Sequence, residues 1–153
     1  MTLPASFPLR MDQVATELGL SLPLSMNHAW VLALAQKSGL PVSFSDLLGK
    51  TGRFDGNLAT TSANNVNVAF ISNAPFFGGT IAFIRTDFGV NETDISFNTT
   101  PNWTGPILIT NHSSGVSARV PYVGSGSWFL SGAVANLIRT GATADAFTIQ
   151  PTS

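Results

Sequence analysis

The chain contains few side chains that could carry out acid–base chemistry near neutral pH. Its two histidines are His28 and His112, and it has no cysteine. Neither histidine stands at a metal-ligand spacing from the other or from a carboxylate. His28 falls in the first turn of an apolar helix pattern, where packing or capping is expected of it rather than catalysis. The sequence therefore predicts no catalytic residue, no metal ligand and no cofactor.

His112 belongs to residues 110–115, a segment typical of a hairpin tip between two strands. A triad can be drawn from His112 with Ser113 or Ser114 and Asp145, but nothing in the spacing supplies the geometry that a triad needs. We therefore expect a protein that is not an enzyme.

A second group of polar residues is acidic. Asp87, Glu92 and Asp94 cluster around one predicted loop and carry the oxygen ligands that Ca²⁺ prefers. Their spacing matches no EF-hand loop. Solvated loop charge is the first interpretation, and a bound calcium ion is left open as the second.

Aromatic residues beside predicted loops form a third group. Trp103 and Trp128 are candidate ligand-stacking residues, because exposed rings at the loops of a β-sandwich can hold sugars or partner proteins. Packing in the core is the other interpretation for both. Phe76 and Phe77 follow a proline and precede two glycines, so we expect at least one of them to be exposed and to contact another subunit.

The composition limits the classes of partner. Charged residues make up 10% of the chain, against about 25% in a typical soluble domain. The seven lysines and arginines are scattered and the net charge is −1, so the chain has no basic stripe that could bind nucleic acid. The shortage of charge favours a neutral polar surface or one that is partly covered by other subunits.

The sequence also predicts neither membrane insertion nor export. The longest apolar run, residues 29–35, is far shorter than the roughly 20 residues that cross a bilayer. The first eight residues lack both a basic segment and a continuous apolar run, which predicts that they are no secretory signal.

Three stretches of the first fifty residues share one pattern. Each has a proline, an aliphatic residue, a polar residue, a large apolar residue and a helix-capping residue, and a helix-like run that ends at a glycine follows. The stretches are Pro8–Asp12, Pro23–Asn27 and Pro41–Asp46, and the glycines are Gly19, Gly39 and Gly49. The pattern predicts short helices near residues 12–18, 27–37 and 45–48, in a helical docking module of residues 1–56.

The second of these helices is apolar nearly all round. Met26, Trp30 and Leu34 form one stripe, and Val31 and Ala35 form another. Such a helix needs packing on more than one side, so we expect it to lie against the second domain or a neighbouring subunit. The predicted interface residues are Met26, Trp30, Val31, Leu34, Phe76 and Phe77.

From residue 57 onward, glycine and small polar residues separate short runs of β-type sequence. The predicted strands are residues 66–72, 79–86, 95–99, 106–110, 116–122, 128–130, 133–138 and 146–150. Residues 56–62 resemble an interdomain linker. The fold is therefore predicted to be mainly β, an antiparallel β-sandwich domain of roughly seven to nine strands at residues 57–153, preceded by the helical module.

Three short pieces of the N-terminal segment occur in a fixed order. They are Met-Asp-Gln-Val-Ala-Thr-Glu-Leu-Gly at residues 11–19, Pro-Leu-Ser-Met at residues 23–26 and Val-Ser-Phe-Ser-Asp-Leu-Leu-Gly-Lys at residues 42–50. Together they resemble a segment that recurs in small virion proteins of tailed bacteriophages. The match is confined to this N-terminal part and says nothing direct about residues 57–153.

This resemblance implies a tail-associated structural protein of the tail tip, baseplate or fibre-attachment region, made in the cytoplasm of the bacterial host and carried in the virion. Its partners would be other virion proteins and further copies of itself, with no nucleic acid or membrane. Two alternatives stay open: a capsid decoration protein, and a carbohydrate- or receptor-binding module that contacts a host surface glycan. A cell-wall hydrolase is the enzymatic alternative.

Overall fold

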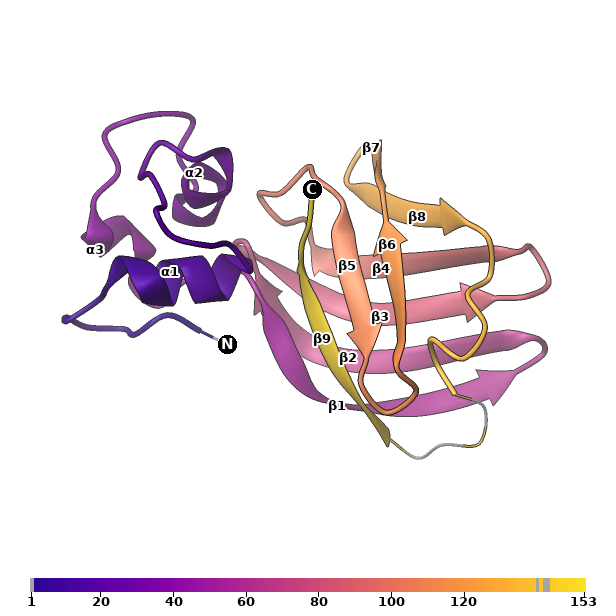
Figure 1. Ribbon diagram of the computed structural model, residues 1–153. Helices are drawn as coiled ribbons and strands as arrows, with labels where there is room; N and C mark the ends of the chain where they lie inside the picture. The colour runs from indigo at the N-terminus through magenta and orange to yellow at the C-terminus, as the bar shows by residue number, and fades with distance from the viewer. Residues whose placement is uncertain (1, 140, 142–143) are drawn as a thin grey trace.

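The computed structural model describes residues 2–139, 141 and 144–153. Within these residues, nine antiparallel strands form one nearly closed sheet, and three short helices precede them (Figure 1). The helices are α1 (Met11–Leu18), α2 (Ala29–Ala35) and α3 (Phe44–Leu47). The strands are β1 (Phe54–Ala63), β2 (Val66–Phe76), β3 (Gly79–Asp87), β4 (Glu92–Thr99), β5 (Ile107–Asn111), β6 (Val116–Val120), β7 (Tyr122–Gly124), β8 (Ser127–Ser131) and β9 (Ala144–Pro151). The prediction of a mainly β protein with a few N-terminal helices is confirmed.

The sheet curls back on itself. Its strand order is β6-β5-β9-β1-β2-β3-β4-β8-β7, and the two strands at its ends, β6 and β7, are consecutive in the chain with only Pro121 between them. Figure 1 shows β5, β6 and β9 crossing over β1 to β4. The two layers therefore face each other and enclose the core between them.

Alternating apolar residues fill the space between the layers. In β5, Ile107 and Ile109 are fully buried, and Ile109 pairs with Ile149 of β9. The same cluster of buried side chains continues into the helices through Leu18 and Leu34. The helices therefore extend the core of the sheet and do not form a separate one.

Two of the predicted strands are not confirmed as drawn. The predicted strand 116–122 is divided at Pro121, so that Val116–Val120 form β6 and Tyr122 begins β7, and residues 133–138 lie in the connection between β8 and β9. The second of these segments is the larger departure. This segment looks like a strand because Leu137 and Ile138 are apolar, and both are indeed buried. Side chains, however, hold its backbone: Asn111 Nδ2 donates to Leu137 O at 2.9 Å and Asn67 Nδ2 donates to Ile138 O at 2.9 Å. It fills the core as a loop.

The interpretation of residues 56–62 as a linker is wrong. These residues lie inside β1, which pairs with β2 and with β9. The strand begins at Phe54, within the predicted helical module. Leu58 is its one buried apolar side chain, so β1 lacks the alternation of apolar residues by which strands are recognised.

The helices end as predicted in two of the three repeats. Gly19 takes the left-handed conformation after α1, with φ 67°, and Gly49 does so after α3, with φ 68°. Helix α2 ends earlier than Gly39, because Gln36 itself takes this conformation with φ 59°. At the start of α2, Nδ1 of His28 accepts a hydrogen bond from the Trp30 N–H at 3.2 Å, which confirms the capping interpretation of this histidine.

Candidate functional site: the junction of helices and sheet

Aromatic rings join the helices to the end of the sheet. Trp30 of α2 meets Trp103, from the loop between β4 and β5, edge to face with ring centroids 5.2 Å apart. Trp103 in turn contacts Phe77, from the turn between β2 and β3, at 5.1 Å. Gly52 fits between Leu18 and Phe77: a Cβ placed on it would lie 3.2 Å from both side chains. The three aromatic residues therefore hold α2 and two sheet loops against one another.

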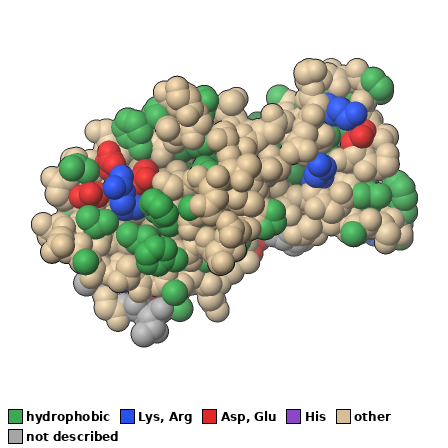
Figure 2. Space-filling model, turned by 180° about the vertical axis from the view of Figure 1, so that it is seen from behind, with side chains coloured by type: hydrophobic (Ala, Val, Ile, Leu, Met, Phe, Trp, Pro, Cys, Tyr) green, Lys and Arg blue, Asp and Glu red, His purple; other side chains and the backbone are tan. Residues whose placement is uncertain are grey.

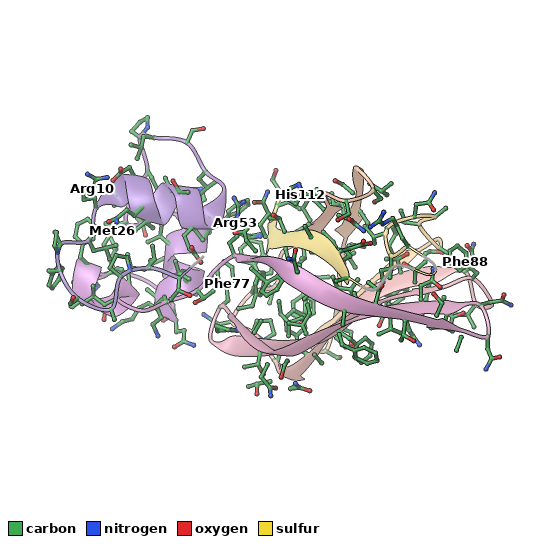
Figure 3. All side chains as sticks on the ribbon, turned by 90° about the horizontal axis from the view of Figure 1, so that it is seen from below. Arg10, Met26, Arg53, Phe77, Phe88 and His112 are labelled. Carbon is green, nitrogen blue, oxygen red and sulfur yellow. The ribbon has the colours of Figure 1, made fainter. Side chains whose placement is uncertain are left out.

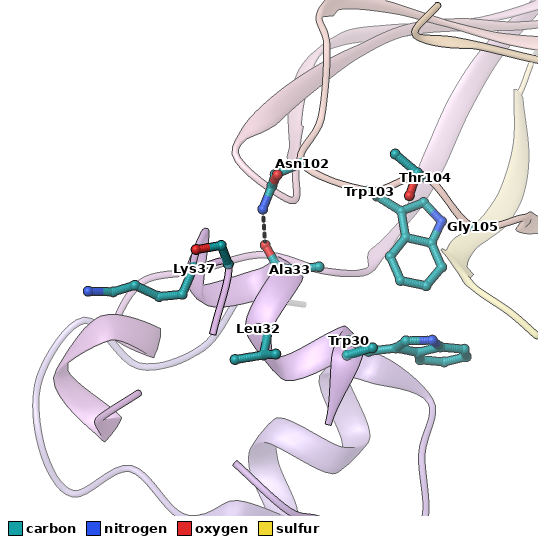
Figure 4. A pocket seen from close by; sticks show the side chains of 10 residues that line it. Trp30, Leu32, Ala33, Lys37, Asn102, Trp103, Thr104 and Gly105 are labelled. Carbon is teal, nitrogen blue, oxygen red and sulfur yellow. Dashed lines mark hydrogen bonds between the residues drawn. The ribbon is translucent and has the colours of Figure 1, made fainter. Parts of the chain in front are cut away.

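Backbone hydrogen bonds reinforce this contact. The Phe77 N–H donates to Thr51 O at 2.7 Å, and Phe77 O accepts from the Asn102 N–H at 2.8 Å. The Asn102 side chain donates from Nδ2 to Ala33 O of α2 at 3.0 Å (Figure 4). Each segment at the junction is thus bonded to the next, so the helices are fixed in orientation relative to the sheet.

A buried carboxyl group lies at the same junction. The Glu17 side chain of α1 is fully buried, and its Oε1 accepts from the Gly52 N–H at 2.7 Å and the Arg53 N–H at 3.0 Å. Its other oxygen, Oε2, has no hydrogen-bond partner among the described residues. Burial raises the pKa of Glu17, and the two backbone hydrogen bonds counteract part of that effect. Sequence analysis did not single out this residue, because its partners lie 35 or more residues away.

A groove runs beside the aromatic contact. It has a volume of about 450 Å³, and its lining includes Trp30, Leu32, Ala33, Lys37, Asn102 and Thr104. Figure 4 shows the Lys37 side chain extending away from Trp30, and its ammonium group lies 3.5 Å from Asp46. The groove therefore combines the half-buried ring of Trp30 with neighbouring amide and hydroxyl groups.

The predicted interface residues are mostly core residues. Val31, Leu34, Phe76 and Phe77 are fully buried within the chain itself. Met26 and Trp30 are half-buried and pack against the same core. The other two helices and the loop between β4 and β5 therefore cover the apolar helix from within the chain. These four buried side chains present no surface to a second subunit.

The two candidate ligand-stacking residues are also buried. The Trp103 indole N–H donates to Pro106 O at 3.1 Å, and the Trp128 indole N–H donates to Gly105 O at 2.8 Å. Both side chains therefore pack in the core with their polar atoms satisfied. Trp30, which was predicted as an interface residue, is the tryptophan that remains partly accessible.

The residues from which a triad could be drawn do not form one. His112 Nε2 lies 2.8 Å from Thr148 Oγ1, which donates to Asp55 Oδ1 at 2.6 Å. Asp145 is bonded instead to Asn111, whose Nδ2 donates at 2.7 Å, and to Arg139. Because the Thr148 hydroxyl proton goes to Asp55, His112 donates to Thr148 and does not act as its base.

The Asp55 carboxylate, which accepts the last of these hydrogen bonds, is held in its ionised form. Partial burial acts to raise the pKa of Asp55, but hydrogen bonds from Arg53 and Thr148 outweigh it and lower the pKa to about 2. Nε of Arg53 lies 2.7 Å from Oδ2 of the carboxylate. A carboxylate with so low a pKa is a weak base, so this arrangement serves the contact between β1 and β9 rather than proton transfer.

Asp55 should make stability depend on acidity. Its pKa is lowered from 3.8 to about 2 in the folded chain, so the stabilisation is complete above pH 3.8 and is lost as the pH falls through the folded pKa. Urea unfolding between pH 2 and 6 should therefore show a steeper acid loss in the parent chain than in Asp55→Asn. Equal slopes for the two proteins would contradict this assignment.

The three acidic residues considered for calcium surround an arginine instead. Arg85 Nε donates to Asp94 Oδ1 at 2.7 Å, Arg85 Nη2 donates to Glu92 Oε1 at 2.5 Å, and Arg85 Nη1 lies 4.0 Å from Asp87 Oδ2. Among the residues described, no group of histidine and acidic side chains has a geometry that could hold a metal ion. The guanidinium occupies the centre of the cluster, where a cation would have to sit.

The N-terminal repeats present apolar side chains to solvent. The residue directly before the proline of each repeat is exposed: Phe7 by 61%, Leu22 by 55% and Leu40 by 59%. The peptide bonds that follow these three residues are all cis. The repeat noticed in the sequence thus has a structural counterpart, with one exposed apolar side chain per copy.

Comparison with known proteins gives no relative: no family model, curated protein or solved structure matches the chain. Among the described residues, none of the helices has the length and apolar content needed to cross a membrane.

Proposed function

We propose that the chain is a non-enzymatic structural protein of a bacteriophage virion, in the tail tip, baseplate or fibre-attachment region, and that its N-terminal segment docks it to a neighbouring virion protein. The observation that carries this proposal is the N-terminal segment, which resembles a segment of small tail proteins and has an exposed apolar residue directly before each copy of its threefold repeat. Phe7, Leu22 and Leu40 are the side chains that such a contact would bury.

The junction supports the same role. A docking segment can orient the rest of its protein only if the two are rigidly connected. Here the contacts of Trp30, Trp103 and Phe77 hold the helices against the sheet. The hydrogen-bonding pattern of His112 supports a protein without catalysis, since its ring donates to a hydroxyl that is already committed to Asp55.

Incorporation into particles tests the proposal. We expect each of Phe7→Ser, Leu22→Ser and Leu40→Ser to be absent from purified particles of the phage whose genome encodes the chain. Each substitution places a polar hydroxyl group where the contact with the neighbouring protein is apolar. Phe88→Ser is the matched control, since Phe88 is 44% exposed but lies outside the repeats. Immunoblots of purified particles give the readout. The docking role would be contradicted if only the Phe88→Ser control were missing from particles. It would equally be contradicted if each of the three repeat variants were incorporated normally.

The groove favours one further candidate, a module that binds a surface glycan. In that case saccharides from the host envelope should change the tryptophan fluorescence of the parent chain and not that of Trp30→Phe, because Trp30 is the tryptophan in the groove that is partly accessible. A capsid decoration protein, the other structural alternative, would be found in particles that lack tails.

A further inference from the structure

A second surface lies on the outer face of β2, β3, β4 and β8. Strand register places Val68, Arg85, Asp94 and Phe129 in one row across these four strands. In the next row Phe70 pairs with Phe83. Because side chains of one row point to the same side of a sheet, this face carries a charged pair, Arg85 and Asp94, with an apolar residue on either side of it.

The aromatic side chains of this face are accessible. Phe70 is 55% exposed and Phe129 is 41% exposed, and Phe83 beside Phe70 is half-buried. Figure 2 shows hydrophobic side chains on the sheet part of the molecule, next to a basic group that acidic groups surround. Exposed aromatic residues and arginine are enriched in protein–protein contact surfaces.

The charge of this face is negative. Asp87, Glu92 and Asp94 surround the single guanidinium of Arg85, so the carboxylates outnumber the cation. Glu92 offers one oxygen to Arg85, and no further bond to its carboxylate is formed within the described residues. This carboxylate therefore retains the capacity to accept hydrogen bonds from a second cation.

A groove follows the line between β4 and β8. It has a volume of about 330 Å³, and Glu92, Asp94, Ser96, Ser127 and Phe129 are among the residues that line it. Its walls thus carry carboxylates, hydroxyl groups and one exposed aromatic ring. Successive side chains of an extended polypeptide point in opposite directions. A segment lying along the groove can therefore direct charged side chains to the carboxylates of β4 and apolar side chains to the Phe129 ring of β8.

We propose that this face binds an extended segment of a partner protein in which lysine or arginine alternates with apolar residues. A second copy of the same face is the less favourable occupant, because two negative clusters would face each other. The proposal shares with the proposed function only the expectation of a protein partner. It concerns other residues than Phe7, Leu22 and Leu40.

Short synthetic peptides test the proposal on the intact chain. We expect an alternating lysine–valine peptide to bind and to shift backbone amide signals of β4 and β8 in nuclear magnetic resonance spectra. An alternating lysine–serine peptide should bind more weakly, and an alternating glutamate–valine peptide should not bind. Affinity should fall as salt is added, because the charged groups lie at the surface.

Two variants and two matched controls locate the contact. Phe129→Ser and Glu92→Gln should each weaken binding about tenfold. Phe88→Ser and Asp12→Asn change an exposed aromatic and an exposed acidic residue that do not line this groove, and they should leave the affinity unchanged.

Three results of the peptide-binding experiments would overturn the proposal. They are amide shifts confined to other strands, an equal loss of affinity in the control variants, and binding of the glutamate–valine peptide. Concentration-dependent self-association that Phe129→Ser abolishes would assign the face to a second copy and would equally overturn it. Absence of peptide binding, combined with loss of Phe7→Ser from particles, would reject this inference and leave the proposed function standing.

Discussion

Replacing Phe77 by alanine is expected to lower the free energy of unfolding by about 3 to 5 kcal/mol. The ring is fully buried and contacts both Trp103 and Phe76. Removing the ring leaves a cavity between the helices and the sheet. This cavity cannot close, because the backbone of residue 77 stays hydrogen-bonded to Thr51 and Asn102.

Urea denaturation followed by circular dichroism gives the measurement for Phe77→Ala. Phe88→Ala is the matched control, because Phe88 is an exposed aromatic residue, and it should change the stability by no more than about 0.5 kcal/mol. A loss below about 1 kcal/mol for Phe77→Ala would mean that this ring does not hold the junction together.

Replacing Glu17 by alanine is expected to lower the free energy of unfolding by about 2 to 4 kcal/mol, because it leaves two backbone N–H groups without their acceptor. These are the N–H groups of Gly52 and Arg53, at the point where the chain passes from the helices into β1. Glu17→Gln keeps an acceptor oxygen at this place and should retain most of the stability. Equal losses in the two variants would contradict the role given to these hydrogen bonds.

The same carboxyl group predicts a dependence on pH. Burial raises the pKa of Glu17 above its ordinary value of 4.5, so the protonated form is favoured in the folded chain. Stability should therefore fall as the pH rises from 4.5 through the raised pKa, since the carboxylate must then ionise in a buried place. Glu17→Gln should lack this fall. The direction is opposite to that expected for Asp55, so the two groups can be told apart.

The sheet could be predicted from the sequence wherever apolar residues alternate. In β6, Ala118 and Val120 are buried and Ser117 and Arg119 between them are exposed, which is the pattern that predicted this strand. Strand β1 was missed because its positions are mostly small and polar. Hydrogen bonds to β2 and β9, rather than the apolar content of β1, determine its conformation.

The junction could not be predicted, because its contacts join residues that are far apart in the chain. Trp30 meets Trp103, and Glu17 meets the backbone of Gly52. The exposure of the phenylalanines was also misjudged. At least one of Phe76 and Phe77 was expected to be exposed, but both rings are fully buried, although Phe77 lies in the turn with a positive φ of 46°. Figure 3 shows Phe77 where the sheet meets the helices, and Phe88 at the far end of the sheet.

The exposed residues of the repeats were likewise not singled out, although the repeat itself was recognised. The pattern begins at a proline, and the apolar residue that is exposed stands one position before it, as Phe7, Leu22 and Leu40 do. A search for apolar residues flanking each copy would have found them.

The position of the chain in the intact particle tests the central claim most directly. Electron cryomicroscopy of purified particles, with the chain located by a bound antibody fragment, gives this position. We predict that it lies at the tail tip, baseplate or fibre attachment, with the segment of Phe7, Leu22 and Leu40 turned toward a neighbouring protein. A particle without the chain, or one that carries it on the capsid surface, would contradict the account.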